Sequence, residues 1–100
     1  MTAQQIIADI DKHLQYSNKA YYSDFYIGIT NDINRRLFGA SEHNVNKEKN
    51  WWIYRTADSK EIAEQVEKYY IDMGMKGDQG GGRDNTTIVY CYEITKDTKQ

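Results

Sequence analysis

The chain has 100 residues and a formal net charge of −2 at pH 7, which predicts a single domain over residues 1–100 and excludes a protein that holds nucleic acid by overall positive charge. Its one cysteine, Cys91, excludes a disulfide framework and a cysteine-based zinc site. The sequence has no apolar run of membrane-spanning length and no signal-peptide pattern, so we expect a cytoplasmic protein without a membrane partner.

The N-terminal part of the chain predicts a helix followed by a short strand. Residues 2–14 begin with a capping box of Thr2 and Gln5 and carry one apolar stripe. From Phe25 to Thr30 the side chains alternate, so that one face is apolar and the other holds Tyr26 and Gly28. Because glycine has no side chain, we expect an open floor beside the Tyr26 phenol where a ligand could approach.

A second, short helix is predicted directly after this strand. Asn31 is the expected N-cap, and Gly39 is the expected left-handed residue at the C-terminal end. An apolar pair four residues apart faces the sheet, which leaves Arg35 pointing away and Arg36 at the border of the apolar stripe. Arg36, rather than Arg35, can therefore reach over the Tyr26 face.

The remaining chain predicts two further strands around a longer helix. Residues 41–50 read as a surface loop, and the apolar content of residues 51–56 on both faces favours a central strand. A capping box of Asp58 and Glu61 predicts a helix to about residue 73. Its expected apolar stripe is Ile62, Val66, Tyr69, Tyr70 and Met73. Glu67 lies at the edge of this stripe and is the acid best placed near the sheet. After the helix, the sequence predicts a loop over residues 77–85 and a final strand over residues 86–94.

Two segments of the chain combine tyrosines with a charged residue at a defined spacing. Tyr26-Ile27-Gly28 is followed by Arg36 ten residues after Tyr26, and a later helix carries Glu67-Lys68-Tyr69-Tyr70-Ile71. In both segments the chain resembles the GIY-YIG nuclease superfamily, over about residues 24 to 72. The resemblance implies an α+β fold, with a small three-stranded, mainly antiparallel sheet flanked by helices.

The first motif of that superfamily is absent upstream of Tyr26. The run Ile88-Val89-Tyr90-Cys91-Tyr92 is most similar to the missing Gly-Ile-Tyr strand. We therefore hypothesise a circular permutation in which the C-terminal strand takes its place. Tyr90 would then supply the first catalytic phenol, with Tyr92 on the same face as the alternative.

Two more positions depart from the family pattern. The position after the arginine helix that often holds His or Tyr is Ala40 here, and His43, three residues further on, is the candidate substitute. The family's asparagine after the acidic helix corresponds to Asn85, at a longer spacing than usual.

The resemblance implies hydrolysis of phosphodiester bonds in DNA. In that reading Tyr26 or Tyr90 is the general base, Arg36 holds the phosphate, and Glu67 binds Mg²⁺ or Mn²⁺. Candidate nucleic-acid contacts are Arg35, Arg55, Arg83 and Asn85, with Lys47 and Lys49 nearby in sequence. A catalytic domain this small implies a homodimer or a protein partner for sequence specificity. The alternative is a catalytically inactive module of the same fold that binds nucleic acid or a partner protein, which Ala40 and the acidic balance favour.

Overall fold

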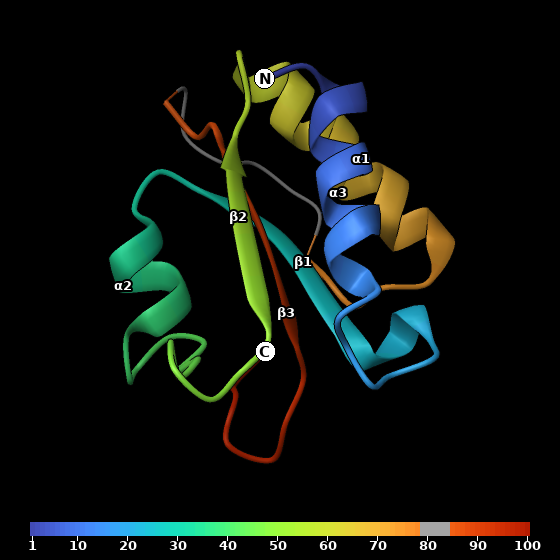
Figure 1. Cartoon of the computed structure of the whole chain (residues 1–100). Helices are drawn as coiled ribbons and strands as arrows, with labels where there is room; N and C mark the ends of the chain where they lie inside the picture. Colours follow the sequence, from blue (N-terminus) through green and yellow to red (C-terminus); the bar gives the residue numbers. More distant parts are fainter. Residues whose placement is uncertain (79–84) are drawn as a thin grey trace.

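Three strands and three α-helices make up the computed structural model, which describes residues 1–78 and 85–100. The elements are α1 (Ala3–Leu14), the 3-10 helix η1 (Tyr22–Asp24), β1 (Phe25–Thr30), α2 (Ile33–Phe38), β2 (Trp52–Thr56), α3 (Lys60–Met73) and β3 (Ile88–Glu93). Helix α2 lies on one side of the sheet, and α1 and α3 lie on the other (Figure 1). The expected α+β fold with a small antiparallel sheet is confirmed. None of the described helices is long and apolar enough to cross a membrane.

The C-terminal strand β3 is the centre of the sheet. It pairs antiparallel with β1 on one side and with β2 on the other, in the order β1-β3-β2. The expectation that residues 51–56 form a central strand is therefore wrong. Strand β2 is apolar on both faces for a different reason, since Ile53 packs into the core below the helices while the Trp52 ring packs on Phe38.

Both edges of this sheet are occupied by hydrogen-bonding groups. On β2, the carbonyls of Trp52, Tyr54 and Thr56 accept hydrogen bonds from His13 Nε2, Arg55 Nη1 and the Met1 nitrogen, at 3.1, 2.7 and 3.1 Å respectively. On β1, the Lys76 backbone forms a parallel bridge with Tyr26. An occupied edge does not offer a row of free backbone groups to another strand.

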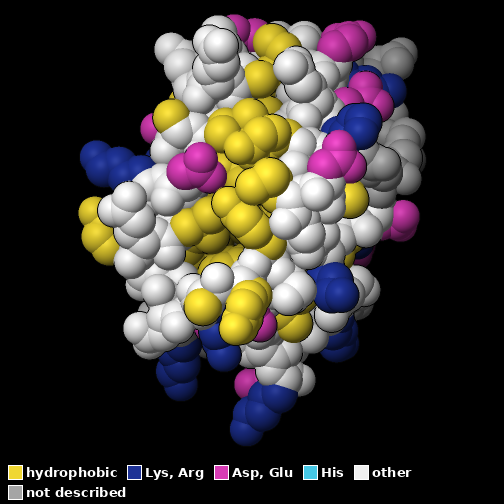
Figure 2. Space-filling view, turned by 90° about the vertical axis from the view of Figure 1, so that its right-hand side faces the viewer, with side chains coloured by type: hydrophobic (Ala, Val, Ile, Leu, Met, Phe, Trp, Pro, Cys, Tyr) yellow, Lys and Arg dark blue, Asp and Glu magenta, His cyan; other side chains and the backbone are white. Residues whose placement is uncertain are grey.

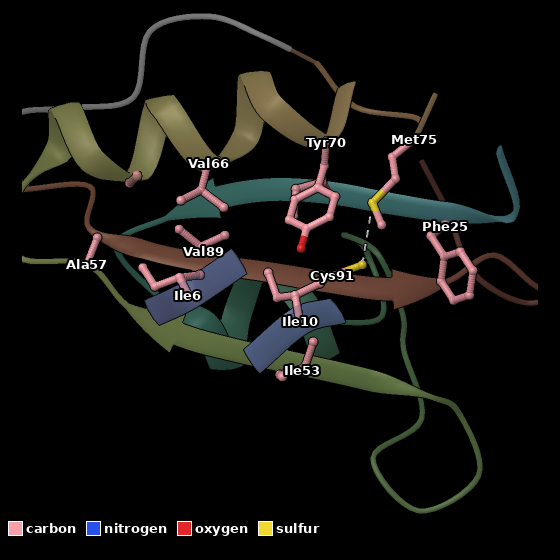
Figure 3. Close-up of a cluster of buried hydrophobic side chains, with 12 residues drawn as sticks. Ile6, Ile10, Phe25, Ile53, Ala57, Val66, Tyr70, Met75, Val89 and Cys91 are labelled. Carbon is pink, nitrogen blue, oxygen red and sulfur yellow. Dashed lines mark hydrogen bonds between the residues drawn. The ribbon is translucent and has the colours of Figure 1, made fainter. Parts of the chain in front are cut away.

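The main core lies between the sheet and the layer of α1 and α3. It is formed by apolar residues of both helices and by the inward positions of all three strands (Figure 3). The expected capping box of α1 is present, because Gln5 N donates to the Thr2 hydroxyl and Thr2 N donates to the Gln5 side chain. The Tyr70 hydroxyl, buried between the helices, shares its one proton between the Asp11 carboxylate at 2.7 Å and Ile7 O at 3.0 Å.

Helix α3 is rotated relative to the expected apolar stripe. Its buried residues are Ala63, Val66, Glu67 and Tyr70. Tyr69 and Met73 are 39% and 44% exposed, so their assignment to the stripe is wrong. The hydrogen bonds of Tyr70 to α1 hold the helix in this rotation. Apolar side chains are visible at the surface of the helical layer (Figure 2).

The caps of α2 and α3 differ from those expected. Asp32, not Asn31, caps α2, because its carboxylate accepts from Arg35 N at 3.2 Å. Ser59, not Asp58, caps α3. Gly39 ends α2 at a φ of −63°, which is not the left-handed conformation expected. Glycine is needed there for space instead, since a Cβ would lie 2.3 Å from the Arg35 carbonyl oxygen.

Candidate functional site

Three tyrosines are stacked on the face of the sheet that α2 covers. Tyr26 lies opposite Tyr92 in the register, and Tyr90 lies opposite Gly28. The Tyr26 ring is 5.3 Å from the Tyr92 ring and 6.4 Å from the Tyr90 ring, with interplanar angles of 19° and 14°. The structure thus places the C-terminal strand beside β1, with Tyr90 and Tyr26 on the same face.

Gly28 provides the space for the Tyr90 ring. A Cβ at this position would lie 2.4 Å from the Tyr90 hydroxyl oxygen and 2.5 Å from Cζ, far inside van der Waals contact. The floor beside Tyr26 that the sequence predicted to be open to a ligand is therefore filled by Tyr90. Because Tyr90 lies far away along the chain, the local pattern of β1 could not indicate this packing.

His43 connects the tyrosines through hydrogen bonds at both ring nitrogens. Its Nε2 is 2.7 Å from the Tyr90 hydroxyl, and its Nδ1 is 2.6 Å from the Lys99 carbonyl oxygen and 2.8 Å from the Tyr92 hydroxyl. A carbonyl oxygen can only accept, so Nδ1 carries the proton in the neutral ring. Nε2 then has a free lone pair, and the Tyr90 hydroxyl donates to it.

The loop after α2 holds His43 in place. His43 N donates to Arg36 O, Val45 N donates to Leu37 O, and Lys99 N donates to His43 O, at 3.1, 3.0 and 2.9 Å. His43 is 1% exposed and Val45 is 4% exposed. The expectation of a surface loop over residues 41–50 is therefore wrong at these two positions, because the loop folds back over the sheet.

Arg36 supplies the positive charge of this cluster. Its Nη1 bonds to Glu42 Oε2 at 2.5 Å, and Arg35 bonds to the other carboxylate oxygen at 2.8 Å. Burial would lower the pKa of Arg36, but the neighbouring Tyr90 and Glu42 raise it. The same ion pair lowers the pKa of Glu42. Arg36 is therefore charged at neutral pH, and its side chain is 35% exposed.

Burial keeps the aromatic groups of the cluster neutral. It raises the pKa of Tyr26 and of Tyr90, and the charge of Arg36 opposes it at both phenols. Burial likewise raises the pKa of Tyr92 and lowers the pKa of His43. The cluster therefore contains a neutral phenol that donates to a neutral imidazole, with a guanidinium beside them. The hydrogen bond connects Tyr90 to His43 along a path for a proton, and both pKa shifts keep that proton on Tyr90 in the resting protein.

Glu67 lies at the margin of this cluster. Its side chain is buried, and burial, followed by the charges of Glu64 and Asp78, raises its pKa to about 7. Its charge raises the pKa of both Tyr26 and Tyr90, as one of the weaker influences. Within the described residues, Glu67 makes no hydrogen bond to the phenols, to Arg36 or to His43. Its link to them is electrostatic.

The carboxylate of Glu67 fits a divalent cation that keeps most of its waters. A cation there would relieve the burial of the charge and its repulsion by Glu64 and Asp78. No group of three or more His, Cys, Asp or Glu side chains in the described ranges could form a complete protein cage. Glu67 is the carboxylate for which the family resemblance implies a metal, and Glu64 and Asp78 are the acidic side chains whose charges act on it.

The remaining predicted contact residues are spread over the molecule. Arg35 is half-exposed and pairs with Asp32 and Glu42. Arg55 bonds to Asp9 of α1 at 2.9 Å, on the side of the sheet away from the phenols. Asn85 accepts a hydrogen bond from the Asn31 side chain and makes none to the cluster. Arg83 falls outside the described residues.

Two partners in the cluster were missed by the sequence interpretation. Glu42 pairs with Arg36 across the turn at Gly39, a contact that helical periodicity does not indicate. Lys99 acts through its backbone carbonyl, and no residue type could indicate that contact.

In comparisons with known proteins, the chain matches no family model, no curated protein and no solved structure.

Proposed function

We propose that this protein is a metal-dependent nuclease that hydrolyses phosphodiester bonds in DNA. The observation that carries the proposal is the 2.7 Å hydrogen bond between the Tyr90 hydroxyl and His43 Nε2, beside the charged Arg36. A phenol with a pKa above 10 is a poor base unless another group takes its proton. His43 is that group. The resemblance of the Tyr26, Arg36 and Glu67 segments to GIY-YIG nucleases supports the same chemistry.

The proton transfer runs through two residues. The Tyr90 oxygen takes a proton from the attacking water while its own proton passes to His43 Nε2. A new bond forms from the water oxygen to phosphorus, and the bond from phosphorus to the leaving oxygen breaks, with its electron pair going to that oxygen. The Lys99 carbonyl then accepts from Nδ1–H of the imidazolium. Arg36 exchanges Glu42 for the phosphate oxygens, where its planar fork stabilises the developing negative charge. Tyr26, beside Tyr90, is placed to donate to the same phosphate.

Glu67 is the residue that would hold Mg²⁺ or Mn²⁺. Such an ion supplies positive charge that stabilises the leaving oxygen. Glu67 must lose its proton to bind it, and a pKa of about 7 makes this possible near neutral pH. Sequence specificity would come from a homodimer or from a protein partner.

One observation favours the second candidate, an inactive module that binds nucleic acid or a protein. Tyr90 is 1% exposed and Tyr26 is 5% exposed, and Arg36 is already paired with Glu42. In that case the phenols and His43 form a buried polar network whose role is to specify the fold. The two candidates differ in whether a phosphate can displace Glu42 from Arg36.

Nicking of a supercoiled plasmid in the presence of Mg²⁺ or Mn²⁺ separates these candidates. Wild-type protein should nick the plasmid, and Arg36→Gln should reduce the rate about 10²–10³-fold because the phosphate loses its charged partner. Arg35→Gln is the matched control, since Arg35 also pairs with Glu42 but is not among the charges that act on Tyr26 and Tyr90, and it should keep most of the activity.

The Glu67→Gln variant keeps the shape of the side chain but removes the ligand charge, so nicking should be lost with either metal. Nicking that survives both Arg36→Gln and Glu67→Gln would come from a contaminant. No nicking by the wild-type protein with either metal would establish the inactive module.

A further inference from the structure

An open groove of about 820 Å³ lies along β2, apart from the buried cluster of phenols. It is lined by the residues of β2 together with Met1, His13 and Lys47. The lining includes the cations Lys47 and Arg55 and no acidic side chain, although the chain as a whole has a net charge of −2. Because Arg55 is paired with Asp9 at 2.9 Å, the positive charge that this lining offers to an anion comes first from Lys47.

Two parallel aromatic rings line this groove. The rings of Trp52 and Tyr54 have centroids 6.1 Å apart and an interplanar angle of 9°. The Trp52 ring also packs edge-on against the Phe38 ring. The Lys47 ammonium lies 4.6 Å from the centroid of the Phe38 ring. Tyr54 is at the open end of this row and is 39% exposed. A row of rings with an exposed end can stack with another planar group.

The row lies on the same face of the sheet as the phenols. Tyr54 lies directly opposite Tyr90, and Trp52 lies directly opposite Tyr92. A planar group stacked on Tyr54 would therefore have its neighbours along a chain close to Tyr90 and Arg36. An extended peptide is a poor occupant, because His13, Arg55 and Met1 already bond to the outward carbonyls of β2.

We infer that this groove binds single-stranded nucleic acid, with an unpaired base stacked on Tyr54 at the open end of the row and backbone phosphates held by Lys47 and Arg55. Stacking on aromatic rings beside cations is the general way in which proteins bind unpaired strands, since bases in a duplex do not expose their faces. Arg55 would exchange its exposed pairing with Asp9 for a phosphate. The inference deepens the proposed function by naming an unpaired strand as the substrate, and it rests on that function for the cleavage step alone.

Tryptophan fluorescence can test the binding directly. The chain has two tryptophans, so Trp51→Phe leaves Trp52 as the reporter. Titration with poly-dT in the presence of a chelator, so that no metal-dependent cleavage takes place, should quench this fluorescence to saturation. Duplex DNA of the same length should bind at least about ten-fold more weakly than poly-dT, because its bases are already stacked. Heparin, a polyanion without bases, should leave the Trp52 emission unchanged.

A matched pair of tyrosines provides the control. Tyr54 and Tyr69 are both 39% exposed, but Tyr69 is on α3, across the sheet from the phenols. Tyr54→Ala should weaken poly-dT binding about ten-fold or more, whereas Tyr69→Ala should leave it unchanged. Trp51 packs against the core, and Trp51→Phe changes that packing. The affinities of the Tyr54→Ala and Tyr69→Ala variants for poly-dT are therefore also compared in protein that keeps Trp51, by anisotropy of labelled poly-dT.

Equal affinity of the Tyr54→Ala and Tyr69→Ala proteins would overturn the inference, as would equal binding of heparin and poly-dT. The plasmid assay is independent of this result. A protein that nicks plasmid but does not bind poly-dT refutes the groove alone, and one that binds poly-dT but cleaves neither plasmid nor poly-dT with Mg²⁺ or Mn²⁺ refutes the nuclease alone.

Discussion

The two faces of the sheet are built from the same three strands but have different physical characters. Toward α1 and α3 the strands present apolar side chains, and packing is the main interaction there. Toward α2 they present Tyr26, Tyr90 and Tyr92, joined to His43 and Arg36 by hydrogen bonds and charge. The alternation of side chains along a strand thus separates a face that stabilises the fold from a face that can do chemistry. Substitutions on each face should differ in what they change.

The largest effect on stability is expected from the apolar face. Ile10 of α1 is 1% exposed in the main core, so Ile10→Ala should lower the free energy of unfolding by about 2–5 kcal/mol. Urea denaturation measures this loss. Ile7→Ala on the same helix is the control, with a smaller loss because Ile7 is only partly buried. In folded Ile10→Ala protein the NMR signals of the His43 ring should be unchanged, and a change there would show that the faces are coupled.

A smaller effect, which depends on pH, is expected at Glu67 between the two faces. Its pKa is about 7 in the folded protein and about 4.3 in an unfolded chain, so the folded state holds the proton more tightly. Stability should therefore fall as the pH rises from about 4.5 to about 7. Glu67→Gln cannot lose a proton, so relative to wild type it should gain on the order of 1–3 kcal/mol between about pH 4 and about pH 8.

Urea denaturation at a series of pH values measures this gain. Added Mg²⁺ should reduce it by binding the wild-type carboxylate, which gives a measure of the metal site that does not depend on activity. Glu48→Gln, in an exposed loop, should show no comparable pH dependence. If Glu48→Gln and Glu67→Gln follow the same curve, burial does not raise the pKa of Glu67.

Much of the apolar face could be predicted from sequence, because its signals are local. The capping box at Thr2, the alternation along β1 and the position of Glu67 at the edge of the apolar stripe, near the sheet, all follow from short periodic patterns. The edge position of β2 could not be predicted in this way. Its apolar content indicates cover on both faces but not which strand is central, and that depends on where β3 inserts.

The polar face was harder to predict, because its contacts join distant segments. Tyr90 fills the space above Gly28, and His43 bonds to the carbonyl of Lys99. Neither contact leaves a periodic pattern in the sequence. The family spacing indicated Tyr26 and Arg36, but the pairing of Arg36 with Glu42 depends on the fold of the loop after α2.

The smallest effect distinguishes the two hydroxyls that flank His43. Tyr90→Phe leaves the lone pair of a buried Nε2 without a donor, which should cost about 1–3 kcal/mol. Tyr92→Phe leaves no such orphan, because the Lys99 carbonyl still accepts from Nδ1–H, so the loss should be only about 0.5–1.5 kcal/mol. If Nε2 carried the proton instead, the Nδ1 lone pair would accept from the Tyr92 hydroxyl. Tyr92→Phe would then leave that lone pair facing only the Lys99 carbonyl oxygen, and it would be the more costly of the two substitutions. Urea denaturation of the two variants, with the ¹⁵N shifts of the His43 ring, therefore shows which nitrogen carries the proton and whether Nε2 is free to accept one from Tyr90.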